Sequence, residues 1–339
     1  MGETGKIDRA FFEEYVASRL GAPRGDIAKG PKHGVDFGVV ETDGPVLAVA
    51  TDPMSILPAI GLERAGRFAT QIVLADVAVS GLAPSHLAVS FALPPGLADD
   101  AFAEFWSGVD AECRDLGVGI VTGHTARYEG CQLPWVGHGT AIAVGDPDAI
   151  CYPDGANPGD RVLVTKGPAV ESTGLLTTLF PEQIDLPDGT LATAQRRLDE
   201  TGSVRDARAV AAAGDVTAMH DATEGGLLGA FHEMADSAGV QFTVDPAEIP
   251  LRPGVADACE ALGMDPWRAT TAGTLVVTVD ADHVEKVRTA LEKRGTPVGV
   301  AGRVESGSGV VFDGERTSPP DGDASWPVYE RLLDESESR

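Results

Sequence analysis

Four aspartates stand at points where the sequence passes between polar and apolar stretches. Asp52 follows the apolar run VLAVA in ATDPM, and Asp76 lies inside the otherwise apolar stretch IVLADVAVSG. Asp36 closes a glycine-rich segment, and Asp221 opens the motif HDATEGG. An isolated aspartate that becomes buried must be paired, capped or bound to a metal. Each could be an ordinary cap or turn residue, but together they predict a site for Mg²⁺, which prefers oxygen ligands and bridges nucleotide phosphates.

The glycine-rich segment GDIAKGPKHGVDFGVV (25–40) is a second candidate for phosphate chemistry. It places Lys29, Lys32 and a histidine around Gly34, ahead of a predicted strand. Glycine lets the backbone approach an anion closely, and lysine neutralises phosphate as a compact point charge. The chain has only six lysines, and Lys166 at the end of another strand is a third in such a setting. The segment does not match the P-loop pattern, so an ordinary surface loop is the alternative.

Two predicted helices begin with small and polar residues. One begins in AMHDATEGGLLGAFHEM (218–234), where Thr223, Gly225 and Gly226 precede an apolar helical pattern. The other begins in VTKGPAVESTGLL (164–176). A helix start of this kind is either a capped terminus or a site where backbone N–H groups and the helix dipole hold phosphate oxygens.

The stretch VTGHTAR (121–127) ends a predicted strand with Gly123, His124 and Thr125. A strand that ends in glycine and threonine can adjoin a phosphate or a metal, although a histidine here can equally be a turn residue. The sequence contains no Ser-His-Asp arrangement, no GxSxG or HExxH motif, and no GxGxxG motif after the first strand.

The elements that must position these residues alternate along the chain. An amphipathic helix is expected at the start, with an apolar face made by Phe11, Phe12, Tyr15, Val16 and Leu20. Strands are expected at 46–51, 86–93, 135–145, 161–166, 216–219 and 274–279, and later in GVAGRV and GVVF. Helices are expected at about 61–81, 98–117, 170–180, 205–213, 224–238 and 283–293. Such alternation predicts an α/β (α+β layered) fold.

A segment dense in turn-forming residues, DPDAICYPDGANPGD (146–160), divides the chain. We therefore expect an N-terminal domain over 1–150 and a C-terminal domain over 151–325. The two ends, MGETGK and residues 326–339, are expected to be solvated tails.

Composition narrows the classes of partner. The chain has 52 acidic residues against 26 basic ones, a net charge of −26, which disfavours nucleic acid and anionic membranes as partners. A scattered acidic coat with little lysine predicts a halophilic protein adapted to a salt-rich cytoplasm. No apolar stretch reaches the ~18 residues of a spanning helix, and the N-terminus lacks an apolar signal core. We therefore expect a cytoplasmic protein.

Several of these motifs occur together in the order found in one superfamily. They are GVDFGVV, ATDPM, LADVAVSGLAP, VTGHTAR, NPGDRVLVTKG, HDATEGGL and TTAGTLVV. Over about residues 8–315 the chain resembles the aminoimidazole ribonucleotide (AIR) synthetase, or PurM-like, superfamily. This group includes the hydrogenase maturation factor HypE, selenophosphate synthetase and thiamine-monophosphate kinase. HDATEGGL is most similar to the HypE branch.

The resemblance implies a two-domain fold in which two subunits pair their N-terminal sheets as a homodimer. It implies ATP and Mg²⁺ as cofactors, bound in the cleft between the domains, and phosphorylation of a small acceptor molecule, in some members followed by loss of phosphate. The metal-site acids it implies are Asp36, Asp52, Asp76 and Asp221. Catalytic roles are implied for Asp52, Asp76 and His124. The implied nucleotide-binding residues are Lys29, Lys32, Gly34, Thr51, Gly123, Thr125, Lys166, Thr223, Gly225 and Gly226.

Two departures from the superfamily's pattern keep the function open. His124 stands where the family commonly has an aspartate, and the chain ends in DESESR where HypE has a Pro-Arg-Ile-Cys tail. The favoured hypothesis is a HypE-like ATP-dependent enzyme that phosphorylates, and in some cases then dehydrates, an amide or hydroxyl substrate. The alternatives are a thiamine-monophosphate-kinase-like phosphotransferase and a non-catalytic nucleotide-binding sensor or assembly module.

Overall fold

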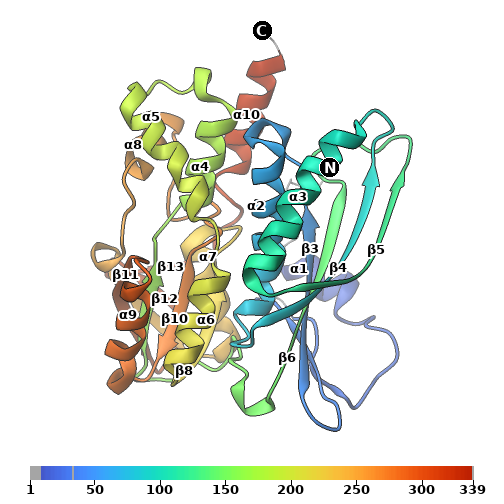
Figure 1. Ribbon diagram of the computed structural model, residues 1–339. Helices are drawn as coiled ribbons and strands as arrows, with labels where there is room; N and C mark the ends of the chain where they lie inside the picture. The colour runs from blue at the N-terminus through green and yellow to red at the C-terminus, as the bar shows by residue number, and fades with distance from the viewer. Residues whose placement is uncertain (1–8, 33, 338–339) are drawn as a thin grey trace.

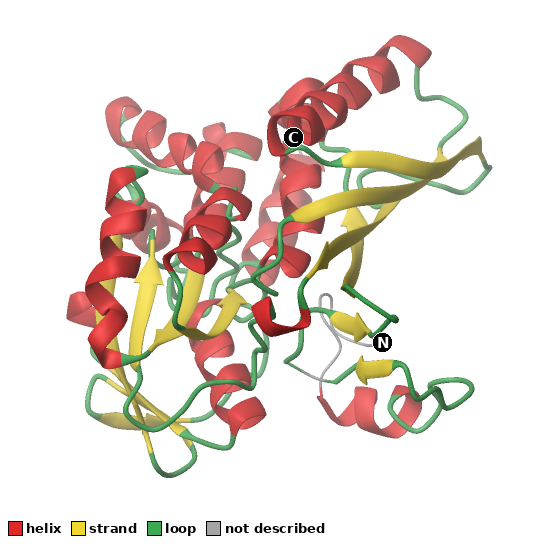
Figure 2. Ribbon diagram, turned by 60° about the horizontal axis from the view of Figure 1, so that its bottom comes forward, coloured by secondary structure: helices red, strands yellow, loops and turns green. Residues whose placement is uncertain are grey.

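Two β-sheets, one in each half of the chain, organise the computed structural model, which describes residues 9–32 and 34–337 (Figure 1). In Figure 2 the long strands of the first sheet extend to one side, away from the second sheet. The first sheet has the strand order β1-β2-β3-β6-β4-β5, in which only β4 and β5 pair in parallel. Its strands are β1 (Ile27–Lys29), β2 (Gly38–Val40), β3 (Val46–Met54), β4 (Pro84–Leu93), β5 (Gly119–Arg127) and β6 (Gly137–Gly145).

Two long helices, α2 (Leu62–Ala78) and α3 (Asp99–Leu116), accompany the first sheet and lie side by side (Figure 1). They cross so closely that only glycine fits at the contact. A Cβ at Gly66 would lie 2.1 Å from the carbonyl oxygen of Phe105, and one at Gly108 would lie 2.0 Å from that of Glu63. This contact fixes the position of α2, which carries Asp76.

The second sheet has the order β13-β12-β9-β11-β7-β10-β8 and is mostly antiparallel. Its central strands are fully buried or nearly so, because helices cover both faces. Helices α6 and α9 pack on one face within a core that continues into the first domain, and α7 packs on the other. The strands are β7 (Arg161–Thr165), β8 (Val216–Asp221), β9 (Gln241–Val244), β10 (Leu275–Val279), β11 (Val298–Glu305), β12 (Gly309–Phe312) and β13 (Glu315–Thr317).

The remaining helices belong to the second half of the chain. They are α4 (Val170–Leu179), α5 (Asp188–Gln195), α6 (Val204–Ala213), α7 (Gly226–Ala238), α8 (Val255–Leu262), α9 (Val284–Lys293) and α10 (Trp326–Glu337). Short 3₁₀ helices lie at Pro58–Ile60, Pro147–Ala149, Pro181–Gln183, Arg196–Glu200, Pro246–Glu248 and Ala281–His283. The expected mixed α/β, two-domain architecture is confirmed.

One expectation about the ends of the chain is wrong, and another holds only in part. Residues 326–337 form helix α10 and not a solvated tail, because Val328 and Leu332 pack into a core shared with α4 and α8. At the start, α1 (Arg9–Phe11) and a π-helix (Phe12–Val16) replace a regular amphipathic helix, and Phe11 and Tyr15 are about half exposed. Residues 1–6, expected to be solvated, and His33 lie outside the described residues.

Within the described part of the chain, no helix combines the length and apolar character needed to cross a membrane.

Candidate nucleotide and metal site

A cavity of about 700 Å³ lies between α2 and β3 on one side and α4 and α10 on the other. Asp52 on β3, Asp76 on α2 and Asp36 in the loop before β2 all line it, together with Thr51. The sequence separates these acids by as many as 40 positions, and the sheet and its helix bring them to one wall. The cavity therefore collects three of the four aspartates that the sequence singles out.

The fourth aspartate joins this group through Asp36. Asp221 ends β8, and its carboxylate, the carboxylate of Asp36 and the imidazole of His220 offer ligand atoms within 4.8 Å of one another. Gly34 makes this approach possible: its φ is +75°, and a Cβ there would lie 3.0 Å from the Cβ of Glu233 on α7. The described residues thus contain one compact group of metal-ligating side chains next to the cavity.

His220 acts in this group as a buried cation. Its Nδ1 lies 3.3 Å from Oδ2 of Asp36, and its Nε2 lies 3.0 Å from Oε2 of Glu233. Burial alone would lower the pKa of His220, but the carboxylates of Asp36, Glu233 and Asp221 outweigh it and raise the pKa to about 10. Both ring nitrogens of His220 already face acceptors, Nδ1 the Asp221 carbonyl oxygen at 2.7 Å and Nε2 the Glu233 carboxylate, so the ligands left for a metal are carboxylate oxygens. An all-oxygen donor set of this kind fits Mg²⁺.

Glu171, in the first turn of α4, is a carboxyl group of the cavity that the sequence analysis did not single out. Its Oε2 accepts hydrogen bonds from the Thr270 hydroxyl at 2.9 Å and the Ala272 amide at 3.0 Å. Burial, with smaller contributions from the charges of Asp323 and Glu224, raises its pKa to about 7 despite those hydrogen bonds. A carboxyl group that titrates near neutral pH can donate or accept a proton during a reaction.

The glycine pair at the start of α7 has a structural explanation. The Gly225 amide donates a 2.8 Å hydrogen bond to Oδ2 of Asp323, so a carboxylate of the chain itself already meets the helix terminus. A Cβ at Gly226 would lie 2.6 Å from the Trp267 carbonyl oxygen. Thr223 lines the cavity, whereas the two glycines do not.

A cluster of three aromatic side chains also lines the cavity. Trp326 and Tyr329 come from α10, and Trp135 comes from the segment before β6. The ring centroids of Trp135 and Trp326 are 6.0 Å apart, and those of Trp326 and Tyr329 are 5.9 Å apart. A cavity lined by both carboxylates and aromatic rings suits a ligand that has a charged part and a flat apolar part.

The predicted lysines do not reach this cavity. Lys29 pairs with Asp154, and the Lys32 side chain is exposed to solvent. Lys166 is buried elsewhere, where its Nζ lies 3.0 Å from Asp206 and donates to the carbonyls of Glu200, Gly202 and Gly273. Burial lowers the pKa of Lys166, and Asp206 opposes that change. Within one chain, these lysines are held by protein groups or face the solvent.

Gly123, His124 and Thr125 also lie away from the acids. They sit in the middle of β5, an exposed strand at the edge of the first sheet, where Nε2 of His124 is 3.5 Å from the Tyr128 hydroxyl. In a single chain these three residues therefore do not contribute to the cavity.

Comparison with known families agrees with this architecture. The model of the N-terminal domain of AIR synthase related proteins matches residues 34–144, and that of the C-terminal domain matches residues 157–314. The chain belongs to the AIR synthase related family. Within it, the chain falls in the HypE-like branch.

Curated relatives carry the name carbamoyl dehydratase HypE. The protein of Escherichia coli (strain K12) is 28% identical over 312 residues, which cover 91% of this chain and 89% of that protein. The protein of Rhizobium leguminosarum bv. viciae is 30% identical over 227 residues, which cover 67% of this chain but only 63% of that protein, less than two thirds of its length.

Solved structures share the fold. The structure of E. coli HypE has a TM-score of 0.71 and 25% identity, and covers 83% of this chain and 88% of that one. A HypE in complex with ATP has a TM-score of 0.64 and 24% identity, with coverages of 90% and 88%. The thiamine monophosphate kinase of Aquifex aeolicus, complexed with AMPPCP and TMP, has a TM-score of 0.69 and 22% identity, with coverages of 85% and 90%.

Proposed function

We propose that this chain is an ATP- and Mg²⁺-dependent enzyme that phosphorylates an oxygen of a small acceptor, such as an amide or a hydroxyl group. The observation that carries the proposal is the convergence of Asp36, Asp52 and Asp76 on one cavity, with Asp221 beside Asp36. The HypE solved with ATP and the kinase solved with AMPPCP support a nucleotide as the ligand.

In this proposal the residues of the cavity have separate roles in phosphoryl transfer. The aspartates would hold Mg²⁺, which supplies charge neutralisation to the phosphoryl oxygens. Trp326 and Tyr329 would pack against the flat part of a ligand, and Glu171 would accept the proton that the attacking oxygen loses. The relatives are named carbamoyl dehydratase. Loss of the phosphorylated oxygen, as phosphate, is therefore a second step to test in this chain.

We also propose that two copies associate along β5. This strand is exposed along nearly its whole length at the edge of the first sheet, and Val121 on it is 54% exposed. An exposed edge strand with apolar side chains is a surface that proteins normally cover. Val121→Asp should convert a dimer to a monomer in light scattering after size exclusion; a wild-type monomer would contradict the proposal.

Calorimetric titration of ATP with and without Mg²⁺ tests the site. High KCl is used because the chain carries 52 acids. Asp52→Asn and Asp76→Asn should each weaken Mg²⁺-dependent binding by at least about tenfold, the effect expected when a metal site is disturbed. Asp43→Asn, at an exposed position outside the cavity, is the control. Unchanged affinity in both folded cavity variants would refute the metal assignment.

Product analysis separates the enzyme from its two alternatives. The Aquifex kinase shares the fold and was solved with TMP, so TMP is the first acceptor to test. Formation of thiamine diphosphate would favour the kinase-like function. ATP binding without any cleavage of ATP, with a panel of hydroxyl and amide acceptors, would favour a nucleotide-binding sensor.

A further inference from the structure

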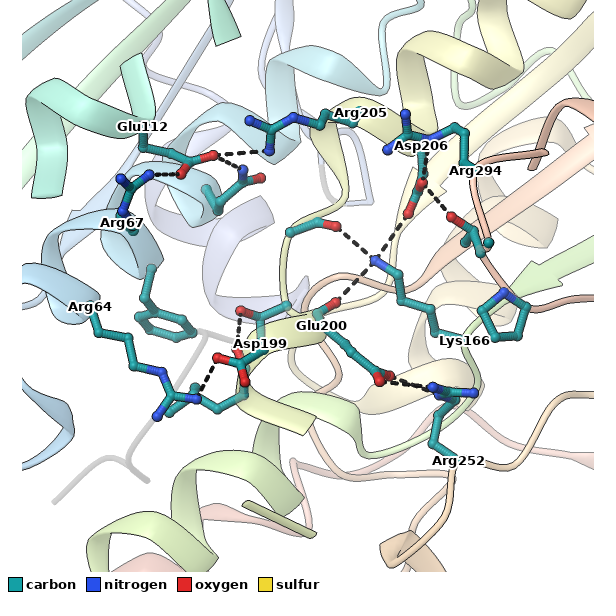
Figure 3. A pocket seen from close by; sticks show the side chains of 18 residues that line it. Arg64, Arg67, Glu112, Lys166, Asp199, Glu200, Arg205, Asp206, Arg252 and Arg294 are labelled. Atoms are coloured by element: carbon teal, nitrogen blue, oxygen red, sulfur yellow. Dashed lines mark hydrogen bonds and ion pairs between the residues drawn. The ribbon is translucent and has the colours of Figure 1, made fainter. Parts of the chain in front are cut away.

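A second cavity, of about 410 Å³, also borders α2 (Figure 3). Helices α2 and α3 form one wall, and residues 198–206 and 294–297 form much of the other. Phe68 on α2 lines both cavities, so the two are neighbours. No residue of this second cavity belongs to the set of acids proposed to hold Mg²⁺.

Positive charge is concentrated here, in contrast to the rest of the chain. Six of the 26 basic residues of the sequence line the cavity, against four acids. The excess of two positive charges remains if the pair Lys166–Asp206 is counted as neutral, whereas the whole chain has a net charge of −26. The other lining cations are Arg64, Arg67, Arg205, Arg252 and Arg294, and the other acids are Glu112, Asp199 and Glu200.

Carboxylates orient the arginines: Arg252 makes a two-nitrogen pair with Glu200, whereas Arg205 and Arg64 each use a single nitrogen. Nη1 of Arg205 donates to Glu112 at 3.1 Å, and Nη2 of Arg64 donates to Asp199 at 2.6 Å. Each of these contacts uses one nitrogen of a guanidinium group that carries five N–H donors in a plane. Figure 3 shows the guanidinium groups arranged around the hollow. The carboxylates therefore orient the arginines in advance, and further donors remain for a ligand.

Gln71 adds an independent observation that points to a ligand. This residue of α2 is only 8% exposed, and its Nε2 donates to Oε1 of Glu112 at 2.5 Å. Its own Oε1 is buried and finds no hydrogen-bond partner among the described residues, although the side chain lines the cavity. A buried acceptor without a donor is costly, and a hydroxyl group of a bound molecule would satisfy it.

We propose that this cavity binds the phosphate group of a small hydroxylated phosphomonoester. Planar guanidinium groups match the oxygens of a phosphate in geometry and in charge. The volume of about 410 Å³ lies within the range of small-molecule sites. Free phosphate shares the anionic chemistry but has no carbon-borne hydroxyl for Gln71, which gives the ester its advantage.

Calorimetry on the full chain at fixed KCl tests this with glycerol 3-phosphate, inorganic phosphate and uncharged glycerol as probes. Glycerol 3-phosphate should bind most tightly and glycerol should not bind. Arg205→Gln and Arg64→Gln, which alter opposite walls, should each weaken binding by at least about tenfold. Arg208→Gln is the matched control, because Arg208 lies on the same helix as Arg205 but bonds to the Leu116 carbonyl outside the cavity.

Further variants separate this site from the proposed nucleotide site. Asp52→Asn should leave the affinity for glycerol 3-phosphate unchanged, and Gln71→Leu should remove the preference for the ester over inorganic phosphate. An ester that binds no more tightly than phosphate would overturn the assignment to an ester. Absence of saturable binding, or binding that Asp52→Asn abolishes and both arginine variants leave intact in folded protein, would overturn the site itself.

Discussion

Glu171→Gln tests the electrostatic description of the acidic cavity. Burial raises the pKa of this carboxyl from 4.5 to about 7, which corresponds to about 3 kcal/mol of unfavourable free energy for the ionised form. The side chain is partly open to the cavity, where water screens some of this penalty, so we expect about 1–3 kcal/mol. Glutamine keeps an oxygen that can accept from Thr270 and Ala272 but carries no charge.

The effect must depend on pH. Below pH 4.5 both the folded and the unfolded chain hold the proton, and Glu171 carries no penalty. As the pH rises from 4.5 to about 7, the unfolded chain releases this proton before the folded chain does. The free energy of unfolding therefore falls over this range. Above pH 7 both states are ionised, and the destabilisation caused by Glu171 is at its full, constant value. The gain from Glu171→Gln should therefore be near zero at low pH and largest above pH 7.

Urea unfolding of both proteins at pH 5 and pH 8, in the same KCl concentration, measures this difference. Glu182→Gln is the control. Glu182 is exposed in the 3₁₀ helix Pro181–Gln183 that follows α4, so its replacement should not raise the stability at either pH. A gain at pH 8 that is no larger than the gain at pH 5 would refute the explanation by desolvation.

Three further perturbations follow from the packing around the site. Gly108→Ala places a Cβ 2.0 Å from the Glu63 carbonyl oxygen and should cost about 1–3 kcal/mol in urea unfolding; full stability would mean that α2 and α3 can separate. Asp323→Ala removes the acceptor of the Gly225 amide and should cost about 1 kcal/mol, with faster hydrogen exchange in the first turn of α7, and unchanged exchange there would contradict it. Trp326→Leu removes the ring contact with Trp135 and should weaken ATP binding about threefold to tenfold by calorimetry; equal affinity would remove α10 from the nucleotide site.

The strongest periodic elements and the acids they carry could be predicted from the sequence. The helix at 61–81 and the strand at 46–51 correspond to α2 and β3, and these place Asp76 and Asp52 at one cavity. The hydrophobic pattern predicts α2 and β3 correctly because their apolar side chains are buried within the same domain.

Contacts between distant segments could not be predicted. Lys166 resembles a loop lysine next to a glycine, but it is buried by three carbonyls from two separate segments, 200–202 and Gly273. Helix α10 was not predicted because the chain ends in the charged sequence DESESR. The apolar residues Val328 and Leu332, spaced i and i+4 ahead of it, did indicate a helix. Glu171 acquires its raised pKa from surroundings that only the folded chain assembles.

The most direct test of the acidic cavity as the nucleotide and metal site is an anomalous diffraction measurement on crystals grown with AMPPCP and Mn²⁺ in place of Mg²⁺. We expect a manganese peak within coordination distance of the carboxylate oxygens of the cavity, with the adenine on the side of Trp326 and Tyr329. A peak elsewhere on the chain, with no nucleotide density between α2 and α10, would contradict the proposed function.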